Sequence, residues 1–183
     1  MACNLTAGRK EPCKDVVGGI RKVYFTDFGG YGTVTQSNDD EITDMSGTFT
    51  AFEYELKGTS SFEQTITSSR ENGTTFFEQT LNITLKKLTK EDNKELKLLA
   101  YGRPHVAVED YNGNVFVMGL EHGADVSGGT VVTGSGLGEL SGYTLTLTSQ
   151  EVLPANFVSA PTAANPFGGM SSATVTVTEG TNS

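Results

Sequence analysis

The 183-residue chain has no tryptophan, two cysteines and two histidines. Cys3 and Cys13 are too few for a disulfide framework, so two free thiols are a stronger expectation than a single disulfide. Neither cysteine lies near His105 or His122 in the sequence, so we expect no metal site. No stretch approaches the roughly 18 consecutive apolar residues of a membrane span, and no apolar leader follows Met1, so neither a membrane partner nor a secretory signal is expected.

Lysine and arginine are missing from the last 80 residues of the chain. From Pro104 to Ser183 there are seven acidic residues and no lysine or arginine. The whole chain carries 13 basic and 22 acidic residues, a formal net charge of −9. Nucleic acid is held mainly through phosphate contacts from lysine and arginine, so we expect no nucleic-acid binding and a surface that repels phosphate.

Patterns that mark catalytic or cofactor sites are missing too. The glycine-rich run GSGLGE (134–139) is followed by a strand pattern instead of a helix, which indicates a flexible or close-packed surface loop and not a phosphate cradle. No Gly-x-Ser-x-Gly turn presents a serine nucleophile. The pair Glu53 and Glu55 and the acidic run at 39–41 are expected to be solvated, not to form an acid/base pair or a calcium site. We therefore expect no enzymatic activity and no cofactor.

Alternation of polar and apolar residues dominates the rest of the chain. Period-two patterns predict strands, the clearest of them at 20–28, 48–58, 61–69, 74–88 and 143–148. Asn72-Gly73 and Asn112-Gly113 each lie between two such runs, which predicts two hairpins. The stretches at 34–47 and after Pro154 have loop composition, although the last residues, 173–183, are able to add one terminal strand.

One helix is predicted, at about 89–101. Thr89 is a suitable N-cap, apolar residues recur at helical spacing, and Gly102 and Pro104 end the segment. The predicted fold is therefore mainly β, an antiparallel β-sandwich or barrel with one flanking helix and extended N- and C-terminal arms. Its parts are an N-terminal arm (1–19), the β-domain (20–153) and a C-terminal tail (154–183).

The order of these elements resembles that of bacteriophage tail tube proteins. The resemblance rests on the hairpins over 49–88, the helix at 89–101, the hairpin HVAVEDYNGNVFVMGL and the glycine-rich run that continues to Thr148. The family is also similar in fold to tube subunits of contractile secretion machines. It implies hexameric rings that stack into a hollow tube, sheets that line an acidic lumen, and passage of DNA without specific binding. The implied partners are copies of the same chain and other tail or virion proteins, in a virion assembled in the host cytoplasm.

Ten residues are candidates for contacts between subunits. Basic side chains in the arm are expected to meet acidic surface on an adjacent ring, the glycines to allow close approach of another chain, and the tail aromatics to pack on a neighbour. The candidates are Arg9, Lys10, Lys14, Gly128, Gly129, Gly134, Gly136, Gly138, Phe157 and Phe167. Two other interpretations stay open: a different virion component, such as a capsid decoration, neck or baseplate protein, and a ligand- or carbohydrate-binding module. The absence of tryptophan disfavours the binding module.

Overall fold

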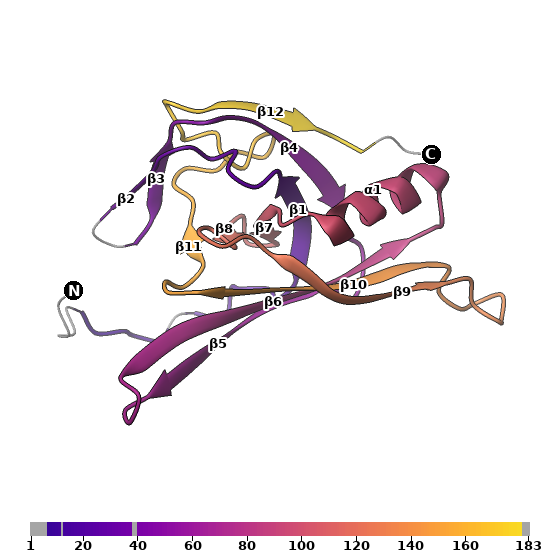
Figure 1. The fold of residues 1–183 in the computed structure, drawn as a ribbon, viewed down its shortest axis with the longest axis horizontal. Coiled ribbons are helices and arrows are strands. Elements are labelled where there is room, and N and C mark those ends of the chain that lie inside the picture. Colours follow the sequence, from indigo (N-terminus) through magenta and orange to yellow (C-terminus); the bar gives the residue numbers. More distant parts are fainter. Residues whose placement is uncertain (1–6, 12, 38–39, 181–183) are drawn as a thin grey trace.

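A computed structural model describes residues 7–11, 13–37 and 40–180, and it is mainly β with one helix (Figure 1). The elements are β1 (Ile20–Thr26), β2 (Val34–Gln36), β3 (Ile42–Met45), β4 (Thr48–Glu55), β5 (Ser61–Ser69), β6 (Thr74–Lys86), α1 (Lys90–Tyr101), β7 (His105–Asp110), β8 (Val115–Met118), β9 (Asp125–Val132), β10 (Gly142–Glu151), β11 (Asn156–Phe157) and β12 (Thr174–Thr178). The predicted fold class, mainly β with antiparallel sheets and one helix, is confirmed.

The strands form two main sheets and a small hairpin. The central sheet has the order β11-β8-β7-β1-β4-β12, and the four-stranded sheet has the order β5-β6-β10-β9. Strands β2 and β3 pair with each other, and Ile42 of β3 also forms an isolated parallel bridge with Val158. All pairs of strands are antiparallel except that between β12 and β4. Both main sheets are open, because neither order returns to its first strand among the described residues.

The central sheet is buried on both faces. Side chains alternate along a strand, so β1 sends Val23 and Phe25 to one face and Tyr24 to the other. The first face packs against Leu81 and Leu147 of the four-stranded sheet. The second face is covered by the β2–β3 hairpin and by part of the C-terminal segment, with buried residues Tyr31, Ile42, Met45, Phe167 and Met170. The molecule therefore has three layers, and the outer face of the four-stranded sheet has no layer over it (Figure 1).

The predicted hairpins and helix are confirmed. Gly73 and Gly113 have positive φ values of 63° and 84° in the β5–β6 and β7–β8 turns, where a side chain would be strained. The Thr89 side chain accepts a hydrogen bond from the Asp92 amide at the start of α1, and Gly102 follows its last residue. Helix α1 is short and lies at one end of the two sheets, where Leu99 packs into the core.

Two regions contain strands that the sequence did not predict. The stretch at 34–47 holds β2 and β3, and Ile42 and Met45 are fully buried. These strands are too short to produce an alternating pattern, and acidic residues separate their apolar ones. The glycine-rich stretch begins with β9, which pairs along β10. Glycine has weak strand propensity, so the many glycines in this stretch gave no strand pattern. The strand forms because it pairs with its neighbour. The predicted loop at 134–139 follows β9 and is confirmed, because those residues lie between β9 and β10 without strand structure.

The C-terminal segment folds back over the central sheet instead of leaving the subunit. Between β11 and β12, Phe167 and Met170 enter the core. Asp44 of β3 fixes the approach to β12, because its carboxylate accepts hydrogen bonds from the Ser171 hydroxyl and from the hydroxyl and amide of Ser172. The Ser172 bonds are the main cause of an Asp44 pKa well below its usual range. Residues 156–178 are thus part of the folded subunit.

His105 at the start of β7 is buried and neutral. Its Nδ1 lies 2.7 Å from the Gly119 carbonyl oxygen, which can only accept, so Nδ1 carries the proton. Its Nε2 accepts a hydrogen bond from the Gly29 amide at 3.0 Å. The ring stacks between Phe28 and Tyr31. Burial lowers the pKa of His105, outweighing the opposing effects of the Gly119 carbonyl and Glu151.

We expect acid to destabilise the fold through His105. Protonation of Nε2 would set two donors, Nε2–H and the Gly29 amide, against each other. Because the folded-state pKa lies below the ordinary value of about 6.5, this contribution is complete above pH 6.5 and is lost as the pH falls through the folded-state pKa. The urea midpoint, measured by circular dichroism from pH 8 to 5, should therefore fall below about pH 6.5. The variant His105→Gln should lose this dependence, whereas His122→Gln should keep it; a midpoint that does not change with pH would contradict the assignment.

Candidate assembly surface

The outer face of the four-stranded sheet is covered with hydroxyl groups. Since Leu81, Ile83 and Leu147 point inward, the residues between them on β6 and β10 point outward. The outward set on the four strands includes Glu63, Thr65, Thr67, Thr80, Asn82, Thr84, Thr130, Thr144, Thr146 and Thr148. Neighbouring strands are linked across this face, for example by the Thr146 hydroxyl, which donates to the Asn82 side-chain oxygen at 2.8 Å. The face is mostly polar and only weakly charged, with Phe76 and Val132 as the large apolar residues at outward positions of the four strands.

The few charges on this face are mostly negative. Glu63, Glu78 and Asp125 occupy outward positions, and Lys86 is the one basic residue at an outward position of the four strands. A polyanion near this face would meet hydroxyls and carboxylates, with few groups that attract phosphate. Outward positions of the four strands thus carry three acidic side chains and one basic side chain.

Neither edge of the four-stranded sheet pairs with another strand of the described residues. Strand β5 pairs only with β6, and β9 pairs only with β10. These edge strands have nine and eight residues, so each offers a long row of backbone donors and acceptors. Native monomers usually shorten, cover or charge such edges because they otherwise pair with another chain. Strand β9 contains no lysine, arginine or proline, and it is open to pairing.

Apolar side chains are exposed beside both edges. Ile66 of β5 and Val131 of β9 are on the inward face of the sheet, beyond the core, with 64% and 62% of their surface exposed. Phe157 of β11 is 54% exposed and stacks edge-on against Phe116, which also contacts Phe62 of β5. We call Ile66, Phe157 and the β5 edge the β5 side, and Val131 with the β9 edge the β9 side. The two sides carry different residues.

Comparisons with known proteins identify no family. No family model and no curated protein matches this chain. Within the described residues, no helix is long and apolar enough to cross a membrane.

The basic candidates are exposed in a segment without regular structure. Arg9, Lys10 and Lys14 precede β1 and make no ion pair with the described residues. The segment is held near its end, where Val17 exchanges two backbone hydrogen bonds with the Asn112 side chain. Cys13 is a free, exposed thiol, and Cys3 lies outside the described residues. The arm's role between subunits stays a prediction.

The glycine candidates divide into two groups. Gly129 is needed within the subunit, since a Cβ there would lie 2.7 Å from the Thr144 carbonyl oxygen. Gly128 has open space around it and no positive φ, so nothing in the subunit requires glycine. It lies on β9, beside the free edge, where the approach of another chain would explain it. Gly134, Gly136 and Gly138 lie in the β9–β10 loop.

That loop binds its own carboxylate. The amides of Ser135 and Gly136 donate to Glu139 Oε2 at 2.6 and 3.2 Å, and the Ser135 hydroxyl donates to the same oxygen. These bonds, led by that from the Ser135 amide, lower the pKa of Glu139. The amides that a phosphate would need are thus already used by the chain itself.

The two aromatic candidates lie in opposite environments. Phe157 is exposed and belongs to the β5 side. Phe167 is 1% exposed and packs against Tyr31 and Phe49, so its side chain is not available to a neighbour. The prediction of Phe167 as a contact residue is wrong, because the segment that carries it returns to the core.

Sequence reasoning missed several features of this surface. Ile66 and Val131 follow the same alternation as buried residues, so no local signal marked them as exposed. An open pocket of about 410 Å³ beside β11 is lined in part by Glu41, Asn114, Phe157 and Pro161, which come from three separate segments. A cluster of Glu121, His122 and Glu151 was also missed, because Glu151 lies 29 residues after His122.

Proposed function

We propose that this protein is a structural subunit that assembles head-to-tail into rings, which stack into the hollow tail tube of a bacteriophage. In this arrangement the four-stranded sheets of neighbouring subunits join edge to edge and their outer faces line the channel. The protein has no chemistry of its own in this role. The observation that carries the proposal is the pair of long, unblunted edges on one sheet.

The difference between the two edges supports a ring. Joining the β5 side of one copy to the β9 side of the next is a heterologous contact. Repeating such a contact closes a ring when the rotation between neighbouring subunits is a whole fraction of 360°. Exposed Ile66 and Phe157 on one side and Val131 on the other supply apolar surface beside each joined edge. An isologous dimer would leave one edge of each subunit unpaired.

The outer face supports a channel. Six-fold or similar closure would gather rows of threonines and a few carboxylates around one axis. The hydroxyl groups of such a wall bind water and its carboxylates repel phosphate, so DNA would pass through the channel without being bound. The exposed arm at 7–18, with Arg9, Lys10 and Lys14, would then reach the acidic surface of an adjacent ring.

Electron microscopy and a binding assay test the proposal together. Tag-free full-length protein, concentrated and viewed in negative stain, should show rings and hollow tubes, and it should not shift duplex DNA in a gel at physiological salt. A protein that sediments as a monomer over the whole concentration range would overturn the proposal. Closed rings that never stack would overturn the proposal of a tube and favour a role as a neck or capsid-decoration protein instead.

A further inference from the structure

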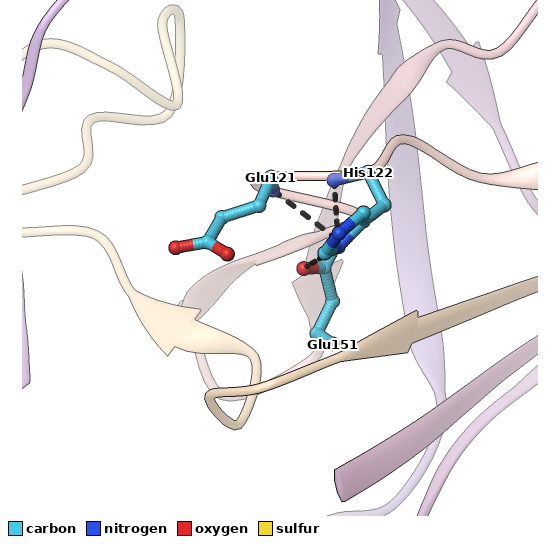
Figure 2. A group of neighbouring side chains, drawn as sticks. All are labelled: Glu121, His122 and Glu151. Carbon is cyan, nitrogen blue, oxygen red and sulfur yellow. Dashed lines mark hydrogen bonds and ion pairs between the residues drawn. The ribbon is translucent and has the colours of Figure 1, made fainter.

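We propose that Glu121, His122 and Glu151 form a binding site for a single zinc-like divalent cation. Glu121 and His122 lie in the turn between β8 and β9, and Glu151 is the last residue of β10 (Figure 2). One ligand atom from each residue lies within 4.8 Å of those of the other two. Imidazole nitrogen and carboxylate oxygen are the ligands that zinc takes in proteins alongside thiolate. The proposal does not depend on the tube function.

The Glu151 carboxylate is prearranged to be a ligand. Its side chain is only 3% exposed, although it is charged. Its Oε1 accepts hydrogen bonds from the amides of Glu121 and His122 at 3.2 and 2.9 Å and from the Ser149 hydroxyl at 3.2 Å. Partners of this kind fix the direction of a ligating carboxylate and are themselves important for metal affinity. With Oε1 occupied, Oε2 is the oxygen that faces the His122 ring.

The separation of His122 and Glu151 is close to that of two metal ligands. Nδ1 of His122 lies 2.9 Å from Glu151 Oε2. Two ligands in a tetrahedral zinc site, each about 2.0–2.2 Å from the metal, are roughly 3.3 Å apart. Replacing the shared proton by the cation therefore needs a movement of only a few tenths of an ångström. The proton on Nδ1 leaves to solvent as the metal binds, as is usual for a histidine ligand.

Glu121 is the third ligand and has to swing inward. Its carboxylate lies to one side of the His122–Glu151 pair in Figure 2, and it makes no hydrogen bond to the described residues. It is exposed and so can rotate at little cost. His122 is 55% exposed and borders an open pocket of about 260 Å³, which gives the cation access and room for a water as the fourth ligand. The bound cation would tie the β8–β9 turn to the end of β10.

Glu121→Gln is the sharpest variant, because the Glu121 carboxylate makes no hydrogen bond or ion pair with the described residues. Titration of tag-free protein with Zn²⁺ at pH 7.5, followed by calorimetry, should give one site per chain. Glu121→Gln should keep the metal-free melting temperature and weaken binding at least about 10-fold, since even loss of a supporting residue costs 10- to 100-fold. His122→Gln should abolish binding, and Glu91→Gln, on the exposed surface of α1, should leave it unchanged.

Two results would overturn the site. One is the absence of saturable one-to-one binding of Zn²⁺ to the wild-type chain. The other is binding that survives both Glu121→Gln and His122→Gln, which would mean that cations are held elsewhere. As an independent readout, the melting temperature of the wild-type chain should rise with Zn²⁺ concentration, and that of His122→Gln should not.

Discussion

Ile66→Lys is expected to leave the subunit folded and to stop its assembly. Ile66 is largely exposed beside the β5 edge, so lysine there buries no charge in the monomer. In a joined pair, the ammonium would lie at an apolar contact next to newly paired strands, where an unpaired charge costs several kcal/mol. Val131→Lys should act in the same way from the β9 side. Sedimentation should show monomers for each variant, with circular dichroism unchanged.

Mixing the two variants distinguishes a head-to-tail contact from a symmetric one. Each variant keeps one intact side: Ile66→Lys retains the β9 side, and Val131→Lys retains the β5 side. A heterologous interface therefore predicts that the mixture forms one-to-one dimers and nothing larger. If β5 instead paired with β5, Val131→Lys alone would dimerise and mixing would add nothing.

Thr146→Lys is the matched control for this experiment. Thr146 lies on β10, away from both edges, on the outer face. Its replacement changes the net charge by the same amount but touches neither side, so rings should still form. If Thr146→Lys also stopped assembly, net charge and not edge pairing would be responsible. If neither edge variant affected assembly, the four-stranded sheet would not be the joining surface.

The sequence predicted elements whose signals are local. The β5–β6 and β7–β8 hairpins depend on an Asn-Gly turn between two alternating runs, and α1 depends on its cap at Thr89. Strand β9 was missed because Gly128 and Gly129 weaken the pattern, and the strand exists only through pairing with β10. The burial of Phe167 was missed because it depends on contacts with residues more than 100 positions earlier.

The assembly surface was less predictable than the fold, for a related reason. Alternation shows which residues share a face, but which strand forms an edge is decided by topology. Phe62 and Ile66 are both apolar, inward-facing residues of β5, yet only Phe62 meets a partner across the layers. Gly129 was predicted to allow the approach of another chain, whereas the structure shows close approach to Thr144 within the subunit. The Glu139 carboxylate was not foreseen as the partner of the amides in the following loop.

Phe167→Ala and Phe157→Ala should separate the stability of the subunit from its assembly. Phe167 is buried against Tyr31 and Phe49, so its truncation leaves a cavity and should cost about 3–5 kcal/mol of unfolding free energy. Its loss also loosens the segment that leads to β12, so amide exchange at 174–178 should speed up before global unfolding. Phe157 is half exposed and contacts Phe116 only edge-on, so truncation should cost about 1 kcal/mol or less.

The two variants should therefore rank oppositely in the two assays. In urea unfolding, Phe167→Ala should have the lower free energy of unfolding. At a urea-free concentration where both variants are folded, Phe157→Ala should assemble less well, because it removes apolar surface from the β5 side. Equal stability of the two would mean that the C-terminal segment is not part of the core. If Phe157→Ala assembled normally, β11 would not be part of the joining surface. The contact would then be made by the β5 edge and Ile66. Since both changes remove the same atoms from the same residue type, a difference between them reports position alone.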